Sequence, residues 1–189
     1  MSQDTFTSPL LDRLARRLFG APLVNNVWRG ELVEEMVAMA LEPEWEHCGG
    51  DYAGCDLLHP ETGHRMQVKQ AAARQSWGMS LSGPRFSIAH KTGEWVDGAR
   101  WVPGRSRNAD IFLFAWHDRT DEEADHRDRD QWQFYVVREV DLPDQKSLGL
   151  PTIQSLAQPC DWQSLRKTVE YLIPVSASPR SMDAGSSPG

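Results

Sequence analysis

The chain has 189 residues, a formal net charge of -7 and 40% hydrophobic residues. This length supports one compact domain, and the acidic balance argues against a protein that coats nucleic acid non-specifically. The sequence has neither an apolar run of about eighteen residues nor a secretory signal, which excludes a membrane protein on these patterns. Three cysteines at unpatterned spacing, Cys48, Cys55 and Cys160, favour reduced thiols and a cytoplasmic location.

The first predicted element is a short amphipathic helix over residues 8–20, which ends at Gly20. Its leucines lie on one side, and Arg13, Arg16 and Arg17 lie largely on the other. These arginines are interpreted as solvating an outer face, although a contact with phosphate is the alternative.

A second helix is predicted from Val27 to Leu41, with Asn25 or Asn26 as its cap. Glu34 falls within the apolar stripe of this helix. A carboxylate on a buried face must be neutralised, paired or bound to a cation, because an uncompensated buried charge is costly. Glu34 is therefore a candidate metal ligand, and a salt bridge to Arg29 or to a neighbouring strand is the alternative.

Residues 54–71 predict a β-hairpin, in which two runs with partial alternation flank a turn at Pro60 to Gly63. If His59 pairs with His64, then Asp56 lies opposite Gln67 on one face. Leu57 opposite Met66 and Cys55 opposite Val68 then form the apolar reverse face. A shift by one residue would mix the two faces, so the register carries the prediction.

In this register the polar face of the hairpin gathers three side chains. Opposite residues have Cβ atoms about 4.5 to 5.5 Å apart, so Asp56 and Gln67 can converge. Lys69 lies two residues after Gln67 and points to the same face. Carboxylate and amide oxygens suit Mg²⁺ or Mn²⁺, and a nearby lysine can orient a water or offset developing charge. This set predicts a phosphodiester-hydrolysing site with Asp56, Gln67 and Glu34 as metal ligands and Lys69 as the activating cation.

Later elements complete a sheet. Strands are predicted at 111–116 and 132–137, with a further short one at 85–89, and a helix at 161–172 with Asp161 as a cap. Residues 174–189 are rich in Ser, Pro and Gly and predict a disordered tail. The prediction is therefore one domain over residues 1–173, with its core at 25–137.

Charge is unevenly distributed along the chain. Residues 65–107 contain eight basic residues and two acids, whereas residues 118–130 contain seven acids and three arginines. A basic middle can hold a phosphate backbone, while the acidic stretch is interpreted as solvated surface. The predicted nucleic-acid contacts are Arg74, Arg85, Lys91, Arg105 and Arg107.

At these motifs the chain resembles the PD-(D/E)XK phosphodiesterase superfamily, which includes many restriction and repair nucleases. Gly30 and Glu34 resemble its G-x-x-x-E helix, Gly54 to Asp56 its G-x-D element, and Gln67 to Lys69 its (D/E)-x-K element with Gln replacing the acid. The resemblance implies an α/β fold with a restriction endonuclease-like αβββαβ core, a central mixed β-sheet flanked by helices.

The same resemblance implies an Mg²⁺- or Mn²⁺-dependent endonuclease that acts on nucleic acid, with DNA favoured, and a homodimer would suit cleavage of both strands. The family places a helix between its last two strands, and that gap here is the acidic stretch 118–130. The helix is therefore expected either to be displaced into the long segment after Lys69 or to be missing.

Two other functions fit parts of the sequence. One is a non-catalytic DNA-binding module that uses the same basic residues on phosphates and Trp77, Trp95 or Trp101 to stack on bases. The other is a structural zinc site, for which the spacing is poor. Its ligands would be His47, Cys48, Cys55, His59 and His64.

Overall fold

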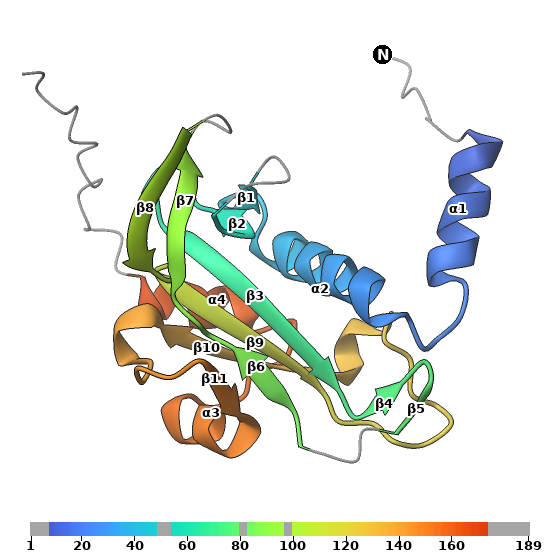
Figure 1. Ribbon diagram of the computed structural model, residues 1–189. Helices are drawn as coiled ribbons and strands as arrows, with labels where there is room; N and C mark the ends of the chain where they lie inside the picture. Colours follow the sequence, from blue (N-terminus) through green and yellow to red (C-terminus); the bar gives the residue numbers. More distant parts are fainter. Residues whose placement is uncertain (1–7, 49–53, 80–82, 97–99, 174–189) are drawn as a thin grey trace, which may run out of the picture.

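A mixed five-stranded sheet forms the centre of the protein in the computed structural model, which describes residues 8–48, 54–79, 83–96 and 100–173 (Figure 1). The strand order is β1-β2-β3-β9-β10. Strands β3 and β9 are parallel and the other neighbours are antiparallel. Their bounds are β1 Glu46–His47, β2 Leu57–Leu58, β3 Arg65–Ala72, β9 Ile111–His117 and β10 Trp132–Arg138. This confirms the predicted α/β class with a central mixed sheet flanked by helices.

Helix α2 (Asn26–Leu41) runs along β3, in agreement with the predicted second helix (Figure 1). The side chain of Asn25 caps it by accepting a hydrogen bond from the amide of Val27 at 3.0 Å. Helix α1 (Pro9–Phe19) is also present where it was predicted, and Ser8 caps it. None of its residues is buried, and Leu10 is 72% exposed, so its apolar side packs on no core of the described chain.

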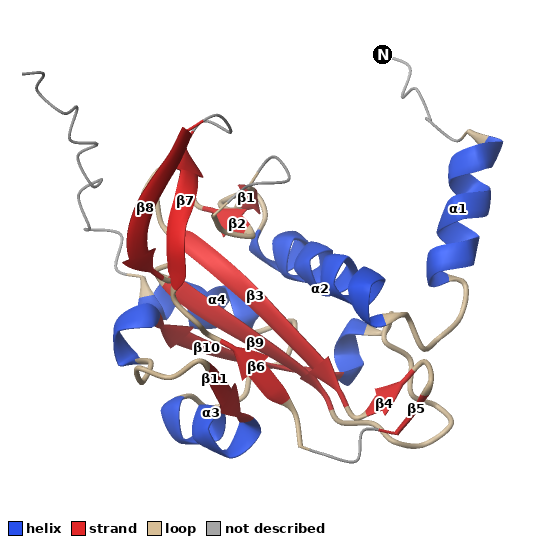
Figure 2. Cartoon of the chain, in the orientation of Figure 1, coloured by secondary structure: helices blue, strands red, loops and turns tan. Residues whose placement is uncertain are grey.

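The sheet separates two apolar clusters, one on each face (Figure 2). Helix α2 and helix α4 (Leu165–Leu172) contribute to the first cluster, together with alternate residues of β3 such as Met66 and Val68. Helix α3 (Leu150–Leu156) contributes to the second. The last helix was predicted from residue 161, but it begins at Leu165, because Asp161 closes a separate turn by accepting from the amide of Ser164 at 2.8 Å.

The predicted hairpin register is confirmed next to the turn, but the predicted pairing of Cys55 with Val68 is not observed, because β2 begins only at Leu57 and the amide of Val68 donates to the side chain of Asp56. Leu57 pairs with Met66 and Leu58 with Arg65, and the amide of His59 donates to the carbonyl of His64 at 2.9 Å. Gly63 has a φ of 71°, a conformation that suits glycine at the end of this turn. Leu57, Met66 and Val68 therefore face the first cluster, as the alternation required.

The long segment between β3 and β9 is built from short strands. These are β4 (Arg74–Gln75), β5 (Gly78–Met79), β6 (Arg85–Ser87), β7 (Lys91–Val96) and β8 (Arg100–Ser106). Only β6 was predicted, and it pairs with β11 (Ser147–Gly149) outside the central sheet. No α-helix lies in the described parts of this segment, and the acidic stretch holds only the 3-10 turn η1 (Arg129–Gln131), followed after β10 by η2 (Glu139–Asp141). The helix expected from the family pattern is thus found in neither place.

The prediction of reduced cysteines is wrong for two of the three. Cys48 and Cys55 form a disulfide, and Cys160 is free. The pairing of β1 with β2 brings the two cysteines together, as the amide of Cys48 donates to the carbonyl of Asp56 at 3.0 Å. The cysteines therefore no longer support the prediction of a reducing compartment. The structural zinc site is also wrong, because two of its predicted ligands, Cys48 and Cys55, are bonded to each other.

Among the described residues, no helix is both long enough and apolar enough to cross a lipid bilayer. The predicted tail at 174–189 lies outside the described residues.

The acidic stretch 118–130 is anchored by a buried histidine. Nδ1 of His126 accepts from the amide of Val24 at 3.0 Å, and its Nε2 donates to the carbonyl of Arg74 at 3.0 Å. His117 and Trp132 pack edge-on against each other, and His117 packs likewise on His126. The stretch is thus more than the solvated surface that its charge suggested.

This histidine should make the fold sensitive to acid. Burial, with the nearby charge of Arg29, lowers the pKa of His126 to about 4, from an ordinary value of 6.5. Below pH 6.5 the unfolded chain takes up a proton that the folded chain refuses, so the free energy of unfolding falls as the pH drops towards 4. The loss attributable to His126 between pH 7 and pH 5 should be about 2 kcal/mol.

Urea denaturation of the wild type and of His126→Gln at pH 7 and pH 5 measures this contribution. Glutamine keeps a donor and an acceptor but does not titrate, so its loss over the interval should be smaller by that amount. An equal loss in both proteins would contradict the assignment.

Candidate functional site

The carboxylate of Asp56 interacts with three consecutive residues of β3. Its Oδ2 accepts a hydrogen bond from the amide of Val68 at 2.7 Å and another from Nε2 of Gln67. The Nζ of Lys69 lies 3.9 Å from the same oxygen. The backbone of Asp56 is fixed as well, because its amide donates to the carbonyl of Met66 at 2.9 Å.

The short length of β2 creates room for this arrangement. β2 pairs with β3 only at Met66 and Arg65, so the edge of β3 beyond Met66 lacks a strand partner on that side. The side chain of Asp56 takes up the amide of Val68 that a longer β2 would have paired. Gln67 and Lys69 follow the strand alternation and lie on the face opposite to Met66 and Val68.

Glu34 reaches the same site from α2. The pKa of Glu34 is raised to about 7, first by burial and then by the negative charges of Asp56 and Glu31, while the charge of Lys69 opposes the shift. The alternative of a salt bridge to Arg29 is not observed, because the guanidinium of Arg29 binds Gln70, Gln75 and Asn26. Within the described residues, Glu34 has no ion pair of its own.

Lys69 lies in an environment that disfavours its protonated, charged form. Burial lowers the pKa of Lys69, and Lys91 acts in the same direction, whereas Asp56 and Glu34 raise it. The Nζ of Lys91 donates to the carbonyl of Gly54 at 2.9 Å, which places strand β7 next to the segment that carries Asp56. A lysine with a lowered pKa holds its proton less tightly and is better suited to proton transfer.

The structure thus brings Asp56, Gln67 and Lys69 into contact, and Glu34 lies near enough for its charge to interact with those of Asp56 and Lys69. The possible metal donors among these residues are two carboxylates and one amide. In the part of the chain that the structure describes, no group of three or more histidine, cysteine, aspartate or glutamate side chains is arranged to hold a metal ion. A metal at this site would need the carbonyl oxygen of Gln67 as its third protein ligand. That amide can donate to Asp56 through nitrogen while its oxygen serves an ion.

The five predicted nucleic-acid contacts do not share one environment. Arg85 and Arg105 are exposed, although Arg105 pairs with Asp144 at 2.9 Å. Arg74 is half-buried and donates to the carbonyl of Asp121. Arg107 does not fit the prediction: it is buried, and its guanidinium pairs with Glu139 at 2.9 Å and donates to the carbonyl of Ile88 at 2.8 Å. Arg107 therefore stabilises the fold and is unavailable to phosphate.

Two of the three tryptophans proposed to stack on bases are accessible. Trp77 is 69% exposed and Trp101 is 45% exposed. The side chain of Trp95 lies outside the described residues.

Sequence reasoning missed two parts of the site. The first is the amide of Val68, whose role follows from the unpaired edge of β3 and has no signal in the residue type. The second is Arg29, which ties α2 to the strands beside Glu34 and was considered only as a salt-bridge partner of that acid.

Comparison with known proteins gives a likeness to solved structures alone. The chain matches no protein-family model and no curated protein. A bacterial homing endonuclease has a similar structure, with a TM-score of 0.40 and 16% sequence identity. The alignment covers 77% of this chain and 96% of that chain.

Proposed function

We propose that this protein is a metal-dependent nuclease that hydrolyses phosphodiester bonds of nucleic acid, with DNA as the expected substrate. The observation that carries the proposal is the arrangement around Asp56, which gathers Gln67, Val68 and Lys69 on one carboxylate oxygen. A carboxylate, an amide oxygen and a lysine held close together can supply the positioning and charge stabilisation on which phosphoryl transfer relies.

The electrostatics of the site fit a divalent cation. Asp56 and Glu34 repel each other, and this repulsion contributes to the raised pKa of Glu34. A cation bound between them would relieve it. All three donors are hard oxygens, which favours Mg²⁺ or Mn²⁺ over softer metals. Asp56, Gln67 and Glu34 would hold the ion, which when bound would polarise a phosphoryl oxygen and acidify a water.

The remaining work falls to the side chains themselves. The hydrogen bond from Gln67 and the amide of Val68 fix the orientation of the Asp56 carboxylate. Lys69, held near Asp56, would orient the attacking water and offset negative charge that develops on the phosphate. The exposed Arg85 and Arg105, with Lys91 next to the Asp56 segment, would hold the phosphate backbone.

Cleavage assays on plasmid and single-stranded DNA with Mg²⁺ or Mn²⁺ test the proposal. Asp56→Asn should lower the rate by about 100-fold or more, because it removes the central ligand. Asp12→Asn changes an exposed acid on α1 in the same way and should leave the rate unaltered. Cleavage by Asp56→Asn at the wild-type rate would overturn the site.

Metal binding should depend on the protonation of Glu34. A pKa of about 7 means that a proton competes with the ion below neutral pH. The apparent Mn²⁺ affinity should therefore rise with pH and be about tenfold lower at pH 6 than at pH 8. Calorimetric titration measures it, and Glu34→Gln should abolish the slope. A slope that persists in this variant would assign the proton to another group.

A second candidate function is a DNA-binding module without catalysis. Gln67 stands where the PD-(D/E)XK pattern has an acid, so the candidate metal site carries one negative charge fewer than that pattern. The exposed Trp77 and Trp101 are available to stack on bases. DNA binding by wild type and Asp56→Asn alike, without cleavage by either, would favour this function.

A further inference from the structure

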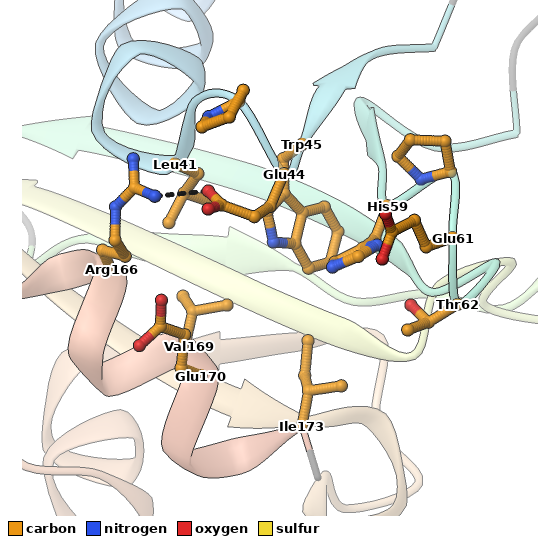
Figure 3. A pocket seen from close by; sticks show the side chains of 12 residues that line it. Leu41, Glu44, Trp45, His59, Glu61, Thr62, Arg166, Val169, Glu170 and Ile173 are labelled. Atoms are coloured by element: carbon orange, nitrogen blue, oxygen red, sulfur yellow. Dashed lines mark hydrogen bonds and ion pairs between the residues drawn. The ribbon is translucent and has the colours of Figure 1, made fainter. Parts of the chain in front are cut away.

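A cavity of about 520 Å³ lies between three elements at one end of the sheet (Figure 3). Its walls are the end of α2 with the turn that follows, the turn of the β2–β3 hairpin, and α4. This volume lies within the range of small-molecule sites in proteins. None of the four residues assigned to the nuclease site lines it.

The floor of the cavity is apolar. Leu41 and Val169 are buried members of the first apolar cluster, and so are Trp45 and Ile173. A ligand that reaches this floor would remove further apolar surface from water, at about 25 cal/mol per Å². The cavity therefore favours a ligand with an apolar body.

The rim of the cavity carries an excess of negative charge. Arg166 forms an ion pair with Glu44, drawn as a dashed line in Figure 3. Two further acids, Glu61 on the hairpin turn and Glu170 on α4, also line the cavity. Neither has an ion pair or a side-chain hydrogen bond within the residues that the structure describes. Because Arg166 neutralises Glu44, the two remaining acids leave a net negative charge at the rim, which favours a positively charged ligand.

His59 adds an unused polar atom. Its ring packs edge-on against Trp45, with the ring centroids 5.4 Å apart, and both side chains line the cavity. Its Nδ1 is buried and has no hydrogen-bond partner among the described residues. A buried polar atom without a partner costs about 1 to 3 kcal/mol. A ligand donor reaches Nδ1 only if the imidazole turns towards the cavity, so the inference does not depend on this atom.

We infer that this cavity binds a small organic cation, an amine with an apolar or aromatic body. The apolar part contacts Leu41, Trp45 and Val169, and the ammonium group lies between Glu61 and Glu170. The inference does not rest on the proposed nuclease function, because it uses none of the residues of that site.

Calorimetric titration of the full chain with three matched probes tests the inference. Phenethylamine, 2-phenylethanol and 3-phenylpropionate share the phenyl ring and a two-carbon spacer but carry a cationic, a neutral and an anionic end. Phenethylamine should bind most tightly and 3-phenylpropionate most weakly, with at least about a tenfold difference in affinity between them. Equal affinity for all three, or no binding of phenethylamine at millimolar concentration, would overturn the inference.

Variants locate the binding. The double substitution Glu61→Gln and Glu170→Gln should weaken phenethylamine about tenfold and leave 2-phenylethanol unchanged, because it removes charge and keeps shape. Glu170→Lys, at an exposed position of α4, should abolish phenethylamine binding. Glu122→Gln, in the acidic stretch outside the cavity, serves as the control. Undiminished binding by the double variant, or loss in Glu122→Gln, would refute this site.

Discussion

Replacing Lys69 by methionine should lower the kcat of DNA cleavage by about 100- to 1000-fold, the size expected for a positioned group that assists proton transfer or offsets charge. Methionine keeps most of the length of the side chain and removes its charge. Metal binding should not weaken, because Lys69 opposes a cation at this site. Its charge lowers the pKa of Glu34 and attracts Asp56, so its removal makes the potential at the two carboxylates more favourable to an ion once both are ionised. Because the removal also raises the pKa of Glu34, the affinities of the two proteins are compared above pH 8.

The combination of a lower kcat with an unchanged or tighter Mn²⁺ affinity distinguishes this role from a structural one. Single-turnover cleavage at saturating metal measures the first quantity, and calorimetric titration measures the second. Lys167→Met changes an exposed lysine of α4 and should affect neither. If Lys69→Met loses metal affinity and rate together, Lys69 maintains the shape of the site and has no direct part in the reaction.

The hairpin shows what the sequence could predict about the candidate site. Alternation along Leu57 to Val68 allows only one register that keeps the apolar residues on one face, and the turn at Pro60 to Gly63 agrees with it. The pairing of Leu57 with Met66 follows from these local constraints. The local sequence therefore suffices to place Asp56, Gln67 and Lys69 near one another.

Residues whose partners are distant in the chain could not be placed in the same way. Arg107 lies in a basic stretch and looks like a phosphate contact, yet its carboxylate partner Glu139 comes from a turn 32 residues later. The Cys48–Cys55 disulfide joins residues only seven positions apart, but it depends on β1, a strand of two residues that has too little pattern to predict. In both cases the tertiary fold supplies the partner, and the local sequence carries no trace of it.

Arg29 is the extreme case, since it is 1% exposed and has no acidic partner among the residues that the structure describes. Its guanidinium donates to Gln70 at 2.6 Å, to Gln75 at 2.9 Å and to Asn26 at 2.7 Å, all of them neutral amide oxygens. Burial lowers the pKa of Arg29 to about 10. Two opposing effects decide its net contribution: the cost of desolvating the cation and the strength of three charge-assisted hydrogen bonds.

The hydrogen bonds should win. Each bond to a charged group contributes about 1.5 to 3 kcal/mol, whereas the lowered pKa corresponds to a desolvation cost of about 3 kcal/mol. Arg29→Met should therefore lower the free energy of unfolding by about 3 kcal/mol and the Tm by about 10 °C in a protein of this size. The loss is limited because Gln70 and Asn26 already lie within 3.2 Å of each other and can bond without the arginine.

Thermal and urea denaturation of three variants test this balance. Arg29→Lys keeps the charge but replaces the planar fork by a single ammonium, so it should recover only part of the loss. Arg166→Met removes an arginine from the exposed pair with Glu44 and should cost less than about 1 kcal/mol. If Arg29→Met proves as stable as the wild type, desolvation outweighs the hydrogen bonds. Arg29 would then be held in the core at a cost to stability, and its position beside Glu34 would call for a reason in function.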